Sequence, residues 1–161
     1  MSLTDLDFLR HTVATLSYRA AKTMRGTDES FAVFRPGPTS NTPLQIVAHM
    51  GDLFDWALTM VAGKPAWNTS TPQNWEKECE RFFAALKRFD DRLASGETIR
   101  YELTLMFQGP VADALTHTGQ LAMLRRLYGL PMKGESYNRA DIQIGRVGME
   151  QTPPDPRFEF D

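Results

Sequence analysis

The sequence predicts an all-α protein: a four-helix bundle with a long first connection and an ordered C-terminal strap. Two observations predict this class. Four segments repeat apolar residues at the helical steps of three and four, and clusters of glycine and proline separate these segments. The length of 161 residues fits one domain, so residues 1–161 are expected to form a single unit, with 131–161 as an extension packed on the bundle.

The first helix is expected from about residue 4 to 24, because apolar residues recur there along one face. These residues are Leu6, Leu9, Val13, Leu16 and Ala20. The following segment, RGTDESFAVFRPGPTSN, concentrates glycine and proline and predicts a long loop, a kind of segment that often carries function. Its two aromatic residues, Phe31 and Phe34, are expected to pack against the bundle.

The second and third helices have local boundary signals. Thr42 can cap the second helix, Pro43 suits its first position and Gly63 can end it. The third helix is expected to stop near Gly96, after an apolar face made of Trp75, Phe82, Leu86, Phe89 and Leu93. Cys79 lies on the same face, and a cysteine in such a position is usually a small inert core residue.

The fourth helix is expected to open at Gly109 and Pro110. The preceding segment, TIRYELTLMFQ, has a partly β-type composition, but a lone strand leaves its edge unpaired, so an extended connection or an extra helical turn is expected there. The helix ends in LYGLP, where Gly129 suits a C-terminal cap. Leu121, Leu124 and Leu127 are expected to mark its core side.

Composition and charge exclude several functional classes. Eighteen basic and twenty acidic residues give a formal charge of -2, which argues against binding to nucleic acid or anionic lipid. The single cysteine cannot form an internal disulfide. The start MSLTDLDFLR lacks the features of a signal peptide, and no stretch approaches the ~20 apolar residues of a membrane span. A soluble, cytoplasmic protein that binds neither membrane nor nucleic acid is therefore expected.

Polar side chains continue the core side of the fourth helix toward its start. Stepping back from Leu121 along this side leads to Gln120, His117 and Asp113. Residues four apart have Cβ atoms about 5 to 6 Å from each other on one helix face, so Asp113 and His117 can bind one ion. The second helix offers His49 as a third ligand. Two histidines and one carboxylate leave coordination positions open, as in catalytic metal sites.

Two neighbouring residues can support these ligands. Asp52 follows His49 by three residues, and Gln120 follows His117 by three. Groups in such positions hold an imidazole in one tautomer and orientation. Gln120 is also a candidate direct ligand, or a partner for a backbone carbonyl.

A plainer interpretation of the same residues is open. Asp113 lies in the first helical turn, where the helix dipole favours an acid, and His117 can hydrogen-bond to it, while His49 can be a core histidine. His11 points away from the apolar stripe of its helix and is expected to face water or a partner. The sequence contains no nucleophile elbow, no phosphate-binding loop and no H-E-x-x-H motif.

The segments TPLQIVAHMGDLFDWAL and GPVADALTHTGQLAMLRRLYGLP resemble the DinB-like superfamily, and the correspondence includes the tail segment GESYNRADIQIGRVG. Members of this superfamily are four-helix bundles with a histidine on the second helix and an H-x-x-x-H pair before a Gly-Gln step on the fourth. His49 matches the first histidine, His117 the last, and Gly119 with Gln120 the Gly-Gln step. Asp113 departs from the pattern, because histidine is usual there; the exchange changes the site's charge and metal preference.

The resemblance implies a divalent metal, zinc or nickel, and a homodimer. It also implies kinship with transferases and isomerases that use bacterial low-molecular-weight thiols. The leading expectation is a metal-dependent S-transferase in which His49, Asp113 and His117 hold the ion and a small thiol attacks an electrophilic small molecule. One alternative is a non-catalytic metal-binding or dimeric interaction protein of the stress response. The other is a metal-assisted hydrolase with the same three ligands.

Overall fold

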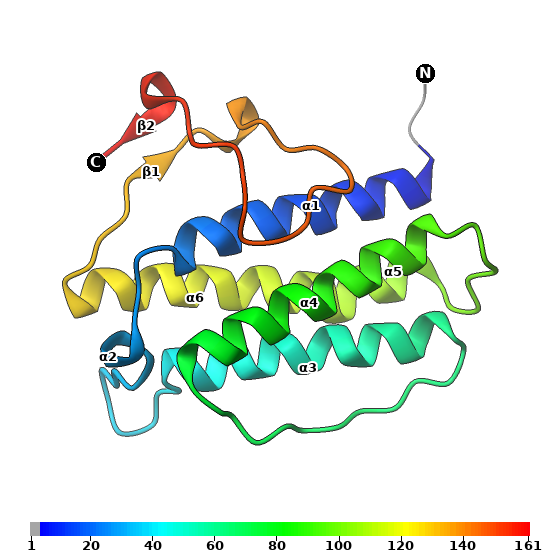
Figure 1. Cartoon of the computed structure of the whole chain (residues 1–161), viewed down its shortest axis with the longest axis horizontal. Coiled ribbons are helices and arrows are strands. Elements are labelled where there is room, and N and C mark those ends of the chain that lie inside the picture. The colour runs from blue at the N-terminus through cyan, green and yellow to red at the C-terminus, as the bar shows by residue number, and fades with distance from the viewer. Residues whose placement is uncertain (1–3) are drawn as a thin grey trace.

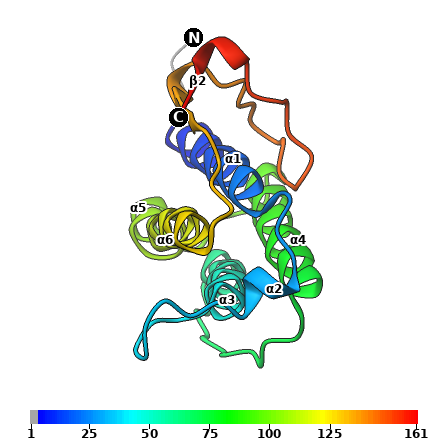
Figure 2. The same cartoon turned by 90° about the vertical axis from the view of Figure 1, so that its left-hand side faces the viewer.

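Four long helices dominate the computed structural model, which describes residues 4–161. They are α1 (Asp5–Met24), α3 (Pro43–Val61), α4 (Trp75–Ala94) and α6 (Ala112–Tyr128). Figure 1 shows that all four run along the long axis of the molecule. In the end-on view of Figure 2, α1, α4, α3 and α6 follow one another around a common core. The prediction of a mainly helical protein is confirmed.

The ends of α3 follow the predicted signals. Thr42 Oγ1 accepts a hydrogen bond from the Gln45 amide, and Gln45 Oε1 accepts one from the Thr42 amide in return, so both residues satisfy free backbone donors at the helix start. Pro43 occupies the first helical position. Gly63, just beyond the end of α3, has a positive φ of 76°, a conformation that favours glycine.

The third predicted helix corresponds to α4, which is capped by Asn74. Its predicted apolar face is buried: Phe82, Leu86 and Phe89 are fully inaccessible to solvent. Cys79 is buried on the same face, as expected, and burial raises the pKa of its thiol to about 12. Such a thiol is almost entirely protonated near neutral pH and is a poor nucleophile.

The fourth predicted helix begins earlier than expected. Helical structure starts with α5 (Leu103–Met106) and continues through the π-helical turn η1 (Phe107–Val111) into α6. The prediction that Gly109 and Pro110 open this helix is therefore wrong, because Pro110 lies inside it. Proline has no amide hydrogen, and its ring conflicts with the carbonyl four residues earlier. One wider π-helical turn accommodates it without ending the helix.

The core side of α6 is also shorter than predicted. Leu121 and Leu124 are buried, but Leu127 is 58% exposed. The prediction of Leu127 as a core residue is wrong, because six helical steps turn its side chain about 120° away from that of Leu121. Tyr128 packs there instead, with its ring 5.6 Å from that of Phe31 and 5.2 Å from that of Phe34. Both loop aromatics thus pack on the helices as expected, and Gly129 ends α6 with a φ of 91°.

The segments outside the long helices lie along them. The first connection contains the short helix α2 (Glu29–Ala32). The tail contains β1 (Gly134–Glu135), η2 (Tyr137–Arg139), η3 (Pro156–Phe158) and β2 (Glu159–Phe160), and its two strands pair antiparallel. Figure 1 shows the tail beside α1.

Buried charges attach the tail to α1. Lys22 Nζ on α1 lies 2.7 Å from Glu135 Oε2 and 3.0 Å from Glu159 Oε1. Tyr18 Oη donates a hydrogen bond of 2.7 Å to Glu135 Oε1, and burial together with this carboxylate raises the pKa of the phenol. Among residues 4–161, no helix combines the length and the apolar composition needed to cross a bilayer.

Candidate metal centre

The three predicted ligands come together in space. His49 lies in the first half of α3, Asp113 and His117 lie one turn apart near the start of α6, and these two helices are neighbours in the core. One potential ligand atom from each residue lies within 4.8 Å of the other two. Residues separated by more than sixty positions in the sequence thus form one group.

The spacing of these atoms fits a bound ion. His49 Nε2 is 3.3 Å from Asp113 Oδ2, and His117 Nε2 is 3.5 Å from Asp113 Oδ1. Ligands held about 2.0 to 2.1 Å from a tetrahedral ion lie about 3.4 Å from one another. Direct charge-assisted hydrogen bonds between imidazole and carboxylate are shorter, about 2.7 to 2.9 Å. Both distances are compatible with joint ligation of one ion, and the contact between His49 and Asp113 is also within hydrogen-bond reach.

Gln120 supports His117 as predicted from its spacing. His117 Nδ1 is 2.8 Å from Gln120 Oε1, so the imidazole donates to the amide oxygen when Nδ1 carries the hydrogen. This tautomer leaves the lone pair of Nε2 free on the side of Asp113. The side chain one turn along α6 can thus hold His117 Nε2 toward His49 and Asp113.

The group lies at the edge of the core and not inside it. The side chains of His49, Asp113 and His117 are 37%, 45% and 16% exposed. Their polar atoms are partly hydrated, so the plainer interpretation of His49 as an enclosed core residue does not describe its position. An ion held here would have room for water or substrate among its ligands.

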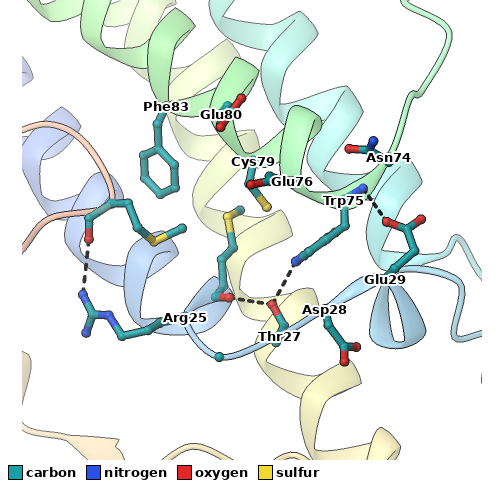
Figure 3. A pocket seen from close by; sticks show the side chains of 13 residues that line it. Arg25, Thr27, Asp28, Glu29, Asn74, Trp75, Glu76, Cys79, Glu80 and Phe83 are labelled. Carbon is teal, nitrogen blue, oxygen red and sulfur yellow. Dashed lines mark hydrogen bonds between the residues drawn. The ribbon is translucent and has the colours of Figure 1, made fainter.

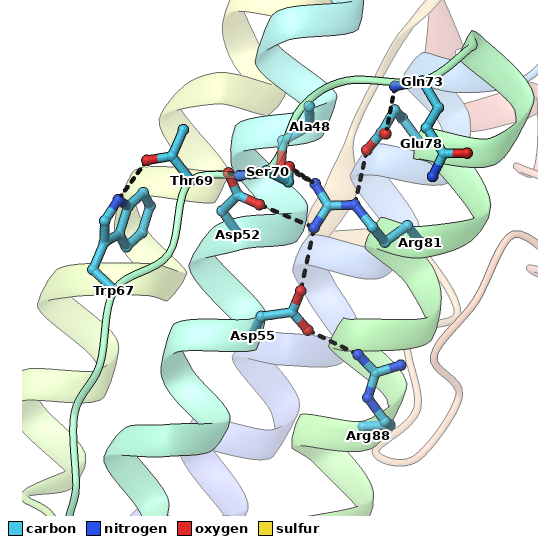
Figure 4. A network of polar contacts seen from close by, with 10 residues as sticks. All are labelled: Ala48, Asp52, Asp55, Trp67, Thr69, Ser70, Gln73, Glu78, Arg81 and Arg88. Carbon is cyan, nitrogen blue, oxygen red and sulfur yellow. Dashed lines mark hydrogen bonds and ion pairs between the residues drawn. The ribbon is translucent and has the colours of Figure 1, made fainter.

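Asp52 does not support His49 in the way its spacing predicts. It is 4% exposed, and its carboxylate accepts hydrogen bonds from Arg81 Nη1 at 3.0 Å and from the Ser70 amide at 3.1 Å. Figure 4 shows these contacts. The physical reason is that three helical steps turn Asp52 toward α4, where Arg81 provides an opposite charge for its buried carboxylate.

Arg81 is the centre of a buried polar network between α3 and α4 (Figure 4). Its guanidinium also donates to Glu78, which is 1% exposed, to the Ala48 carbonyl and to Ser70 Oγ. Burial disfavours the charge of Arg81, but the carboxylates of Glu78 and Asp52 outweigh burial and raise its pKa. Gly51 makes room for this group, since a Cβ atom there would lie 2.7 Å from Arg81 Cζ.

The network holds the loop 62–74 that carries Trp67 to the metal centre. Ser70 Oγ accepts a hydrogen bond from Arg81, and the Ser70 amide donates one to Asp52. Three residues earlier, Trp67 packs its ring 5.5 Å from that of His49. The ring of Trp56 lies 5.7 Å from that of Trp67. These two tryptophans form an aromatic wall beside His49. Trp67 was not predicted as a site residue, although a tryptophan within a loop rich in small and polar residues is itself unusual.

Two hollows flank the three ligands. A cavity of about 370 Å³ lies beside Asp113, with Trp56, Gln108 and Gly109 among its lining residues. A second hollow, of about 570 Å³, lies beside Gln120 and is lined mainly by apolar atoms, including those of Ile46 and Met123. The candidate metal centre is thus bordered by the aromatic wall and by one largely apolar hollow, on which a small molecule can rest.

His11 lies on α1 and is not part of the group. No family model matches this sequence, and no curated protein or solved structure is significantly similar to it. The resemblance to the DinB-like superfamily therefore rests on the sequence motifs quoted above.

Proposed function

We propose that the chain is a four-helix bundle of the DinB-like type and a metal-dependent enzyme that transfers an electrophilic small molecule to a low-molecular-weight thiol. The observation that carries this proposal is the convergence of His49, Asp113 and His117, whose ligand atoms lie within 4.8 Å of one another at a partly exposed position. A catalytic site needs this combination of grouped ligands and solvent access.

The donor set supports a divalent ion, and zinc or nickel is proposed because imidazole nitrogen suits both. A bound ion of this kind lowers the pKa of a thiol or water molecule that joins it. Asp113 stands where the DinB-like pattern has a histidine, and it adds a negative charge to the ligand set. The site should therefore hold a divalent cation more strongly through charge attraction.

The residues around the ligands would bind and orient the reactants. Gln120 holds the His117 ring, so the ligand geometry is set before any substrate arrives. The aromatic wall of Trp56 and Trp67 and the apolar hollow beside Gln120 would provide a surface for the apolar part of an electrophile. Productive binding would therefore favour a compact, largely apolar electrophile over a charged one.

A homodimer is proposed on the basis of exposed apolar side chains on α6. Met123 and Leu127, one turn apart, are both 58% exposed, and Leu130 follows at 36%. Apolar residues grouped on one face of a helix are typical of surfaces that contact a partner. The mass of the protein in solution, compared with that of a Met123→Lys/Leu127→Lys variant, tests this part of the proposal.

The activity is tested by incubating the protein with a panel of small thiols and 1-chloro-2,4-dinitrobenzene, with and without added Zn²⁺ or Ni²⁺. The expected result is metal-dependent thioether formation that His117→Gln abolishes. His11→Gln is the matched control, because it removes a histidine outside the group, and it should leave the rate unchanged. Turnover without thiol would favour the metal-assisted hydrolase, and no turnover of any kind would favour the non-catalytic interaction protein.

A further inference from the structure

A separate cavity of about 1010 Å³ lies away from the metal centre. It is enclosed by the end of α1, the connection that contains α2, the start of α4 and a point of the tail at Met149. It shares no lining residue with the metal centre or with the two hollows beside it. In Figure 2, α1 and α4 lie on one side of the molecule, and α3 and α6, which carry the three ligands, lie on the other.

The floor of this cavity is apolar and rich in sulfur and aromatic groups. Its side chains belong to Met24, Trp75, Cys79, Phe83 and Met149. Trp75, Cys79 and Phe83 are labelled in Figure 3. Trp75 is held in place, because its indole N–H donates to Thr27 Oγ1 at 3.1 Å and its ring meets that of Phe31 edge to face at 5.6 Å. Methionine side chains adapt to irregular apolar shapes. The floor thus offers a preformed aromatic wall with an adaptable neighbour.

The rim of the cavity is acidic. Four exposed carboxylates surround it, from Asp28, Glu29, Glu76 and Glu80. None of them forms an ion pair within residues 4–161. The one basic residue at the rim, Arg25, donates to the Met149 carbonyl. Several negative charges with one positive charge produce a negative potential at the mouth of the cavity.

Two features place three of these carboxylates near the start of α4. Glu76 and Glu80 lie one turn apart on α4, at the spacing where like charges repel and destabilise a helix. Glu29 is fixed against the start of the same helix, because its Oε2 accepts a hydrogen bond of 2.8 Å from the Trp75 amide. A cation at the mouth would relieve the repulsion between Glu76 and Glu80.

We propose that this cavity binds an amphipathic organic cation, a small molecule with an aromatic or apolar body and an amine or quaternary ammonium group. The body would displace water from the sulfur-rich and aromatic floor, while the ammonium group would stay partly hydrated between Glu76 and Glu80. The cavity volume lies at the upper end of the range of small-molecule sites, roughly 300 to 1,000 Å³. Apolar contact supplies affinity, and the rim selects the sign of the charge.

Three probes of similar shape and different charge test the proposal: 4-phenylbutylamine, 4-phenylbutan-1-ol and 4-phenylbutanoate. The indole N–H signals in a ¹H–¹⁵N spectrum report the location, since one of the three tryptophans, Trp75, lines this cavity and the other two, Trp56 and Trp67, lie at the metal centre. The amine is expected to shift the Trp75 signal alone and to bind more tightly than the alcohol. The carboxylate should bind most weakly.

The double variant Glu76→Gln/Glu80→Gln keeps the size of both exposed side chains. It should weaken binding of the amine roughly three- to tenfold at low salt, as expected for two carboxylates near a partly hydrated cation, and leave binding of the alcohol unchanged. Glu97→Gln, just beyond the other end of α4, is the matched control and should have no effect.

Three results would overturn the proposal. The first is equal binding of the carboxylate and the amine, and the second is an unchanged amine affinity in the double variant. The third is the absence of any shift of the Trp75 signal when the amine is added. If a basic amphipathic peptide shifts that signal and the amine does not, the occupant is a macromolecular partner and the proposal is likewise overturned.

Discussion

Replacing Arg81 with methionine is expected to destabilise the protein and to release the loop that carries Trp67. Methionine keeps most of the apolar stem but removes the charge that balances Asp52 and Glu78, whose side chains are 5% and 1% exposed. Removing one partner of a buried ion pair costs about 3 to 5 kcal/mol. The Arg81 side chain is itself 22% exposed, so water compensates part of the loss and the lower end, about 3 kcal/mol, is expected.

Urea unfolding followed by circular dichroism measures this loss, which corresponds to a fall in Tm of about 6 to 12 °C for a domain of this size. Arg88→Met on the same helix is the matched control. Its partner Asp55 is 45% exposed and Arg88 itself 54%, and exposed pairs contribute about 0 to 1 kcal/mol. A loss for Arg81→Met no larger than for Arg88→Met would refute the account of the network.

The loop provides a second readout of the same variant. Ser70 Oγ accepts one hydrogen bond from Arg81, and the Ser70 amide donates one to Asp52, so loss of the guanidinium should speed amide exchange in residues 64–74. The indole signal of Trp67 should also move, because its packing against His49 depends on that loop. If the variant is destabilised but amide exchange in residues 64–74 is unchanged, the network supports the packing of the helices and not the loop.

The remaining predictions concern stability and reactivity. Gly129→Ala should lower the free energy of unfolding by about 1 kcal/mol, because φ is 91° at that position. Thr42→Ala should lower it by a similar amount, because the variant loses the cap of α3. Thermal unfolding measures both changes. The Cys79 thiol, with a pKa of about 12, should react with a disulfide reagent at pH 8 more than a hundredfold more slowly than the unfolded chain does. Because the unfolded thiol ionises near pH 8.5 and the folded one near 12, unfolding releases a proton between these values, and the contribution of Cys79 to stability should fall as the pH rises through that window. Lys22→Met should leave Glu135 buried without its cation and expose the tail to limited proteolysis, whereas equal protease resistance of variant and parent would contradict the role of this pair.

The parts of the fold that were predicted correctly depend on local signals. Thr42, Pro43 and Gly63 act within one turn of the ends of α3, and the apolar face of α4 repeats at helical steps. The pairing of Asp113 with His117 is also local, since both lie on one face of α6. His49 could be predicted as the third member of the site because it borders the apolar stripe of α3, and that stripe had to face another helix.

The parts that were missed depend on contacts distant in sequence. Asp52 turns to Arg81, which lies 29 residues away on α4, and nothing in its own surroundings in the sequence indicates this partner. The approach of Trp67 to His49 depends on the path of a loop. The start of the last helix was misplaced because proline usually marks a helix boundary, whereas here a π-helical turn absorbs Pro110.

The divalent metal content of the purified protein tests the central claim most directly. The account predicts about one zinc or nickel ion per chain by elemental analysis. It predicts a large loss of metal in Asp113→Ala and in His117→Ala, whose circular dichroism spectra should match that of the parent, since both residues lie at the edge of the core. A protein that neither contains nor binds a stoichiometric ion, or an Asp113→Ala/His117→Ala variant that retains one, would contradict the assignment of His49, Asp113 and His117 as a metal centre.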